Sequence, residues 1–179
     1  MASILNADKI RATGSTTDAL TVDSSGRMLT PNRPMFKVYR TSNTDFGSAQ
    51  NNTKMTGWND DTSAGTVNVG GFWSTANDRA TAPVTGMYMF EIKGYFNINT
   101  YGQIGIAMYV NGGTAKGADF RTNREQNSHN GYDSVSFNTH LYLAASDYVE
   151  FYFIQQNGTA SLHTSSGNFY SGVCGHLVG

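Results

Sequence analysis

From Met35 onward, large apolar residues alternate with small or polar ones along several stretches of the chain, as they do on strands with one buried face. The alternating sets are Tyr88, Phe90 and Ile92; Ile104, Ile106, Met108 and Val110; Val135, Phe137, Leu141 and Leu143; and Val149, Phe151 and Phe153. Turn-forming sequences separate the sets, for example Asn111-Gly112-Gly113 and Asn157-Gly158. Because helical periodicity is hard to find, the pattern predicts an all-β antiparallel sandwich or jelly roll.

Two of these stretches also carry small, aromatic or aliphatic residues on their opposite face, which is less polar than a solvated face would be. The pattern therefore predicts a second buried surface, either in a subunit interface or inside a large sandwich. We favour subunit packing, in which Glu150 faces a cation of a neighbouring subunit. The candidate trimer-interface residues are Tyr109, Glu150, Tyr152 and Ile154.

Residues 1–33 differ from the rest of the chain, since they are rich in Ser, Thr, Asp and Gly with isolated apolar residues. Residues 8–26 and 26–34 predict short strands that turns at Gly14 and Ser24-Ser25-Gly26 interrupt. The segment has too few apolar residues to fold alone. We therefore expect a docking segment that orders against its own domain, a sister subunit or a larger assembly, followed by a β-domain over residues 34–179.

Composition and charge exclude several classes of protein. The chain has 179 residues, of which 39% are hydrophobic and only 14% are charged, with 20 glycines and a formal net charge of -1. No basic run offers a surface for nucleic acid. The single cysteine, Cys174, cannot form an intrachain disulfide. With no apolar signal core and no stretch that is apolar enough to span a bilayer, we expect folding in a cytosol and no membrane insertion.

The stretch ATAPVTGMYMFEI, residues 80–92, resembles the central motif of the complement C1q and tumour-necrosis-factor-like domains. The motif positions are Pro83, Gly86, Tyr88, Phe90 and Ile92, and Tyr170 and Gly172 occupy those of the family's closing strand. Residues 146–153 are similar to its penultimate strand. The sequence departs from the family at two positions: Ala80 stands where an aromatic residue is usual, and Tyr170 replaces the phenylalanine of the closing strand. Over residues 34–179 the resemblance implies a ten-stranded jelly roll that packs as a homotrimer, with aromatic residues lining the three-fold axis.

No collagen-like Gly-X-Y repeat precedes this domain. Residues 8–34 followed by a C1q-like domain instead resemble proteins that marine bacteriophages, particularly those of cyanobacteria, carry as tail fibres, spikes or head decorations. That resemblance implies a structural virion protein, made in the host cytoplasm, which residues 1–33 anchor to other virion proteins. The alternative is a receptor-binding module for a host-surface glycan or outer-membrane protein. Its candidate residues in apical loops are Trp58, Asn59, Arg121, Arg124 and Tyr132.

Catalytic and metal-binding chemistry is poorly represented. The chain has no convincing carboxylate pair and no Gly-x-Ser-x-Gly nucleophile elbow, so we expect no enzyme. Cys174 and His176 share a face of a terminal strand, where a thiol beside a hydrogen-bonded histidine is a commoner arrangement than a metal site. Asp60-Asp61 offers oxygen ligands but lacks the spacing of a dedicated calcium loop. We expect no cofactor, while the sequence leaves open calcium and a metal that Cys174 and His176 would hold across a three-fold axis.

Overall fold

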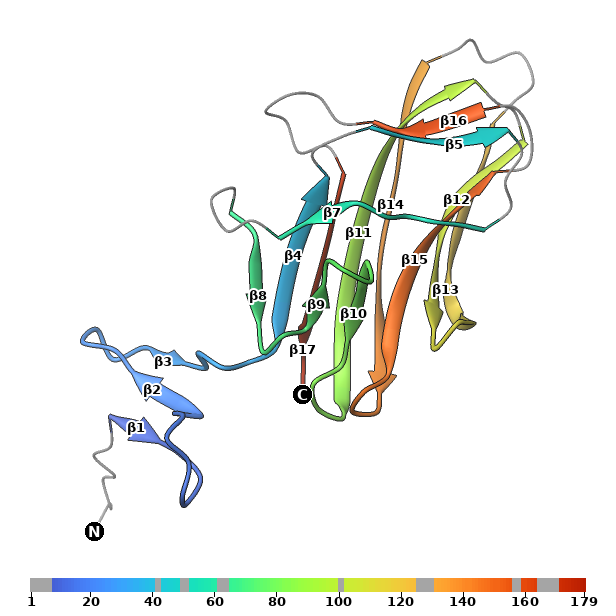
Figure 1. Cartoon of the computed structure of the whole chain (residues 1–179). Helices are drawn as coiled ribbons and strands as arrows, with labels where there is room; N and C mark the ends of the chain where they lie inside the picture. The colour runs from blue at the N-terminus through green and yellow to red at the C-terminus, as the bar shows by residue number, and fades with distance from the viewer. Residues whose placement is uncertain are drawn as a thin grey trace.

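The computed structural model describes residues 8–40, 43–48, 52–60, 65–99, 102–124, 131–155, 159–163 and 171–179, and these form strands and turns without a helix (Figure 1). The strands pair antiparallel in three sheets. This confirms the all-β jelly-roll fold expected from the alternation of apolar residues. The described residues include no helix that is long and apolar enough to cross a membrane.

Two of the sheets face each other in the jelly roll. The β11 sheet has the order β5-β16-β11-β17-β4-β7, with β14 paired to β11 and β8 to β4. Its strands are β4 Met35–Arg40, β5 Thr44–Ser48, β7 Trp58–Asn59, β8 Val67–Val69, β11 Gly86–Asn99, β14 Gly131–Leu143, β16 Thr159–Leu162 and β17 Gly172–Leu177. The β15 sheet has the order β13-β12-β15-β10-β9, with β6 paired to β15. Its strands are β6 Thr53–Lys54, β9 Trp73–Ser74, β10 Arg79–Thr81, β12 Gly102–Val110, β13 Gly113–Arg124 and β15 Tyr148–Gln155.

The hydrophobic core lies between these two sheets. Tyr88, Phe90 and Ile92 of β11 are fully buried, and so are Phe151 and Phe153 of β15. Phe90 meets Phe151 across the core with ring centroids 6.3 Å apart. Each buried aromatic or aliphatic side chain of this kind contributes roughly 1.5–3 kcal/mol relative to an exposed one. The predicted inward faces are confirmed, although Val110, Phe137 and Leu141 are only partly buried at the edge of the core.

The Pro-Val-x-Gly turn and β11 are held together by the tyrosine of the motif. Pro83 is exposed in the turn, whereas the Tyr88 hydroxyl reaches back and donates to the Val84 carbonyl at 2.6 Å. A Cβ atom on Gly86 would lie 2.7 Å from a methyl group of Leu177 and 3.0 Å from the Gly179 carbonyl oxygen. Close packing against the C-terminal residues therefore requires glycine at this strand entry, as the sequence indicated.

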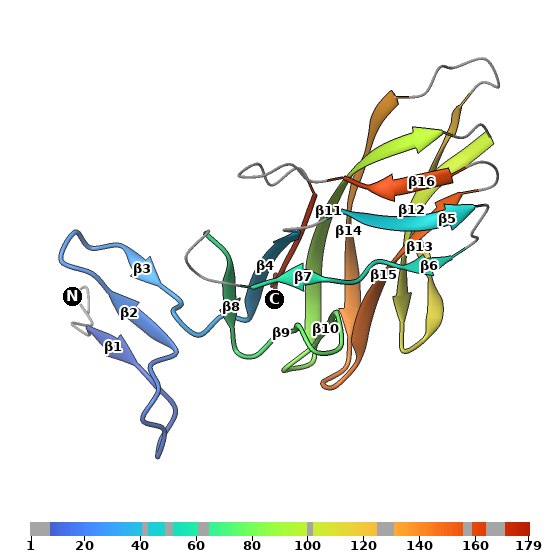
Figure 2. The ribbon, with the colours of Figure 1, turned by 45° about the horizontal axis from the view of Figure 1, so that its top comes forward.

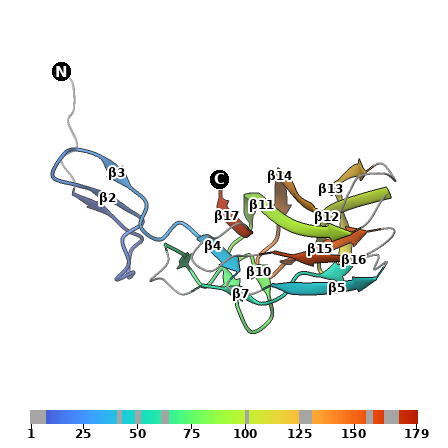
Figure 3. The same ribbon diagram turned by 90° about the horizontal axis from the view of Figure 1, so that it is seen from above.

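The third sheet consists of β1 Lys9–Ile10, β2 Leu20–Val22 and β3 Met28–Leu29. These are the short strands that the sequence predicted in residues 8–34. We call the third sheet the N-terminal sheet. It lies beside the jelly roll in all three views (Figures 1, 2 and 3). At the junction, the Leu177 amide donates to the Pro34 carbonyl at 2.9 Å and the Arg33 guanidinium donates to the Val178 carbonyl. The boundary between segments 1–33 and 34–179 stays a prediction.

Candidate functional site

The outer face of the β11 sheet is the surface of the jelly roll on which exposed apolar side chains gather. Along β11, the side chains that alternate with the core residues point away from the sandwich, and β14 pairs with β11 over its whole length. Each outward residue of β11 therefore has an outward neighbour on β14. Along this face the chemistry changes from apolar through polar to aromatic.

The apolar end of the face is a cross-strand row of three exposed side chains. Met87 is paired with Tyr142, and on its other side the Val178 amide donates to the Met87 carbonyl at 2.7 Å. Tyr142 is 70% exposed, Met87 38% and Val178 41%. The next residue of the face is Met89, which is half-buried. We call Met87, Met89, Tyr142 and Val178 the apolar patch.

Histidines and charged residues follow the apolar patch along the face. His140 and His176 flank Met89 on either side, and Glu91 is paired with Asn138 and with Cys174. Cys174 and His176 thus share the outer face, as the alternation predicted. Burial, and after it the negative charge of Glu91, raises the pKa of the Cys174 thiol. Among the described residues, no three His, Cys, Asp or Glu side chains come together as metal ligands would.

At the far end of the face, three aromatic rings contact one another. Tyr95 and Tyr132 are stacked with centroids 5.3 Å apart and planes 7° apart, and the His163 ring lies 4.7 Å from Tyr132. Tyr132 is 53% exposed. Asn97 and Ser134 are exposed beside the rings. We call Tyr95, Tyr132 and His163 the aromatic cluster; with its amide and hydroxyl neighbours it has the composition of a surface for sugars.

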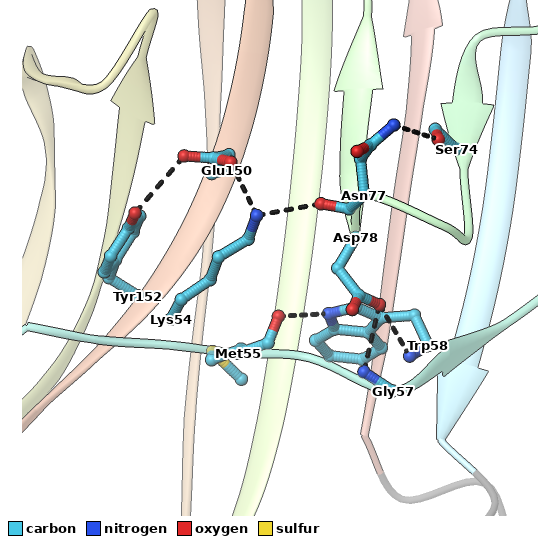
Figure 4. A network of polar contacts seen from close by, with 9 residues as sticks. All are labelled: Lys54, Met55, Gly57, Trp58, Ser74, Asn77, Asp78, Glu150 and Tyr152. Carbon is cyan, nitrogen blue, oxygen red and sulfur yellow. Dashed lines mark hydrogen bonds and ion pairs between the residues drawn. The ribbon is translucent and has the colours of Figure 1, made fainter.

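The sequence placed the trimer-interface candidates on the outer face of the β15 sheet. On this face, the polar groups of Lys54, Glu150 and Tyr152 find their partners within one chain (Figure 4). The Lys54 ammonium contacts the Glu150 carboxylate at 2.5 Å and donates to the Asn77 carbonyl at 2.8 Å. The Tyr152 hydroxyl donates to Glu150 at 3.2 Å. Burial, and after it the Glu150 charge, raises the pKa of Tyr152 to about 12. The cation that Glu150 meets in the structure therefore belongs to its own chain.

The remaining candidates on this face differ in exposure. Tyr109 and Tyr152 are both half-buried and stack with centroids 4.1 Å apart. Ile154 is only 1% exposed, so the chain already covers it and no second subunit is needed to hide it. Ile154, which was expected at a subunit interface, is thus buried within its own chain. An interface role for Tyr109, Glu150 and Tyr152 stays a prediction.

Trp58 was expected in an apical loop, but it is a core residue with 3% exposure. Its indole NH donates to the Met55 carbonyl at 2.9 Å, and its backbone NH donates to the Asp78 carboxylate at 3.1 Å (Figure 4). The Arg40 guanidinium lies over its ring at 5.7 Å, and burial lowers the pKa of that guanidinium. Trp58 therefore offers no face to a sugar. Asn59 is half-buried on β7, paired with Tyr39.

The other loop candidates lie on strands that run further than the sequence suggested. Arg121 and Arg124 belong to β13, opposite Gly105 and Gly102, and Tyr132 belongs to β14, opposite Asn97. Their placement in a loop was therefore wrong, although Tyr132 is exposed as expected. Tyr170 and Asp61 lie outside the described residues, while Gly172 begins β17, where an added Cβ would lie 3.2 Å from the Val38 carbonyl.

Sequence reasoning missed the apolar patch. The outward face of β14 is polar over most of its length, and Tyr132 and Tyr142 are its two aromatic residues. Two aromatic residues on an otherwise polar strand face were a signal in the sequence that this face is more than a solvated surface. What the sequence lacked was the register that places Tyr142 beside Met87 and Val178.

Comparison with solved structures identifies the architecture. The globular domain of zebrafish complement 1qA protein superposes with a TM-score of 0.55 at 17% identity, covering 82% of this chain and 98% of that chain. The Eiger TNF of S. frugiperda superposes with a TM-score of 0.59 at 10% identity, covering 82% of this chain and 94% of that chain. No family model and no curated protein sequence matches the chain. At these identities the likeness shows the fold alone, which is a C1q/TNF-like jelly roll.

Proposed function

We propose that the chain is a non-enzymatic display module that assembles as a homotrimer through the outer face of its β11 sheet. The observation that carries the proposal is the exposed apolar row of Tyr142, Met87 and Val178. Closed symmetric assembly is the usual way in which a soluble protein hides such a surface. The C1q/TNF-like fold supports the same arrangement, because the sequence resemblance to that family implies a homotrimer.

The proposed site of display is a bacteriophage virion, on a tail fibre, a spike or the head. Support comes from the sequence, in which a segment of 33 residues that is too small to fold alone precedes the jelly roll. Residues 1–33 would anchor the trimer to other virion proteins while the jelly roll faces outward. Antibody labelling of purified particles by electron microscopy tests this placement, and particles without label would contradict it.

Sedimentation of the full chain tests the trimer. The wild-type chain should sediment as a trimer, whereas Tyr142→Glu should place a charge in the apolar contact and release monomers. Ser136→Glu is the matched control, since Ser136 lies on the same strand and face, is exposed in the polar stretch of the face and is paired with Lys93. A wild-type monomer, or a Tyr142→Glu variant that stays trimeric, would refute the role of this patch.

The second candidate function is recognition of a host-surface glycan, and the aromatic cluster favours it. Tyr132 presents an exposed ring beside Asn97 and Ser134, so a pyranose could stack on the ring and hydrogen-bond to its neighbours. Binding to host cells should fall with Tyr132→Ala and persist with Asn138→Ala, which removes an exposed polar side chain elsewhere on β14. Equal retention of both variants on the cells would exclude the cluster as the binding surface.

A further inference from the structure

The register of the N-terminal sheet places four apolar side chains on one face. Ile10 is paired with Leu20, and Met28 is paired with Val22. Leu20 and Val22 are two residues apart on β2 and so point to the same side. Ile10, Leu20, Val22 and Met28 therefore share what we call the aliphatic face, while Lys9, Thr21 and Leu29 form the opposite row.

Polar contacts give this small sheet a defined shape. The Asp18 carboxylate pairs with Lys9 and Arg11, each at 3.0 Å. At the turn between β2 and β3, the Asp23 carboxylate accepts from the Ser25 and Arg27 backbone amides, both at 2.9 Å, and from the Arg27 side chain at 2.7 Å. These bonds hold the strands together, but they supply no core. Ile10 remains 50% exposed and Met28 74% exposed.

The part of the jelly roll that the structure describes leaves Ile10 and Met28 of the aliphatic face exposed. The contacts that the structure describes at the junction involve Arg33 and Pro34 with the backbone near the C-terminus, not the strands of the N-terminal sheet. The N-terminal sheet lies beside the jelly roll in Figures 1, 2 and 3. Among the described residues nothing covers Ile10 and Met28, and a partner from another chain would hide them.

We infer that the aliphatic faces of three copies pack against one another and form a three-sided prism on the axis of the proposed trimer. Four aliphatic side chains are far fewer than the roughly 20–30 residues that each partner contributes to a standard interface between independent proteins. So small a surface can hold partners together only if they are already tethered to one another. Tethering gives them an effective concentration in the millimolar range, so that a weak contact suffices. The inference therefore rests on the proposed trimer.

Geometry and charge are compatible with that packing. Residues 30–34 connect β3 to β4, and a fully extended chain of this length spans at most about 18 Å. At the junction, Arg33 contacts Val178, which is a member of the apolar patch. Three N-terminal sheets packed on the axis would therefore keep the apolar patches of the three jelly rolls near one another. Residues 8–33 carry four cationic and three anionic side chains. The net charge of +1 that results leaves little electrostatic repulsion between copies.

Cysteine cross-linking of the full chain tests the prism. In a Cys174→Ser background, which removes the only natural thiol, Met28→Cys places a thiol on the aliphatic face. Leu29→Cys, the next residue on the same strand, places it on the opposite face and is the matched control. A trifunctional maleimide should join three chains of the Met28→Cys protein, which denaturing electrophoresis resolves, and should mostly label single chains of the Leu29→Cys protein.

Sedimentation of the same samples separates the two proposals. A trimer in which Met28→Cys cross-links no better than Leu29→Cys would overturn the prism, assign the aliphatic face to a different protein, and leave the jelly-roll trimer intact. A monomeric protein would overturn both proposals. If Met28→Cys cross-links three chains even when Tyr142→Glu is added, the prism stands and the apolar patch is not what holds the copies together.

Discussion

Tyr88 shows why the motif has a tyrosine at a position whose ring is completely buried. Its hydroxyl donates to the Val84 carbonyl at 2.6 Å and accepts from the Val84 amide at 3.4 Å, so it fixes the turn that leads into β11. Burial raises the pKa of Tyr88, so this donor keeps its proton to a higher pH than an exposed tyrosine would. A phenylalanine would fill the same space but leave both backbone groups of the turn without this partner, at a cost of roughly 1–3 kcal/mol.

At Gly175, an added methyl group would meet two aromatic rings of the core. A Cβ atom there would lie 2.7 Å from the Phe36 ring and 2.9 Å from the Phe90 ring. Both rings are almost completely buried and cannot move aside easily. Gly175→Ala should therefore lower the free energy of unfolding by about 1–3 kcal/mol, measured by chemical denaturation.

Gly113→Ala is the matched control for this overpacking. Gly113 also lies on a strand, but the nearest atom to its added Cβ would be the Val110 carbonyl oxygen at 3.6 Å, an ordinary contact distance. We expect a change within about 0.5 kcal/mol. If both variants lose the same stability, close packing around Gly175 is not the cause.

Tyr152 should lose its phenolic proton at an unusually high pH. Its pKa is raised from 10.0 to about 12, first by burial and second by the Glu150 charge. Between these two values the unfolded chain has lost the phenolic proton while the folded chain keeps it, so the free energy of unfolding falls as pH rises. Glu150→Gln removes the second cause and should shift the phenolate absorbance transition of Tyr152 to lower pH. A transition unchanged by Glu150→Gln would mean that burial alone sets the pKa.

At the scale of the strands, the sequence predicted what depends on neighbouring residues along the chain. The inward sets of β11, β12 and β15 are buried, and the turn at Asn111-Gly112 lies between β12 and β13. What depends on pairing between distant strands was not accessible. Trp58 was expected in a loop because it stands in a polar stretch, yet Asp78 and Arg40, distant in sequence, hold it in the core. β13 reaches Arg124 because β12 pairs with it, although residues 121–124 are polar.

The N-terminal segment and the jelly roll should separate on truncation. In the part of the chain that the structure describes, strands β1, β2 and β3 pair with one another and with no strand of the other two sheets. Deleting residues 1–33 should therefore leave a cooperatively folding jelly roll, while it abolishes incorporation into particles. The control is the full-length chain expressed from the same promoter in infected cells. A marked drop in melting temperature, with aggregation, would mean that the segment completes the jelly roll instead.

For the molecule as a whole, assembly through the apolar patch should make stability depend on protein concentration. Where dissociation and unfolding are coupled, mass action raises the melting temperature as the concentration of chains rises. We expect this dependence over a hundredfold dilution series followed by calorimetry. The Tyr142→Glu variant should melt at a temperature that does not change with concentration. A wild-type melting temperature that also does not change with concentration would mean that the unfolding of a subunit is not coupled to dissociation of the trimer.

The position of β17 has a consequence for how the chain is made. This strand, Gly172–Leu177, lies between β11 and β4 and hydrogen-bonds to both, so it joins residues near the start of the jelly roll to its middle. During synthesis, β4 and β11 leave the ribosome long before the strand that must be inserted between them. The pairing of β11 and β4 through β17 therefore cannot form while β17 is still being made, and it must close after residue 177 has emerged. Until then the nascent chain exposes two strand edges to neighbouring nascent chains, a stage at which chaperones would improve the yield of soluble protein.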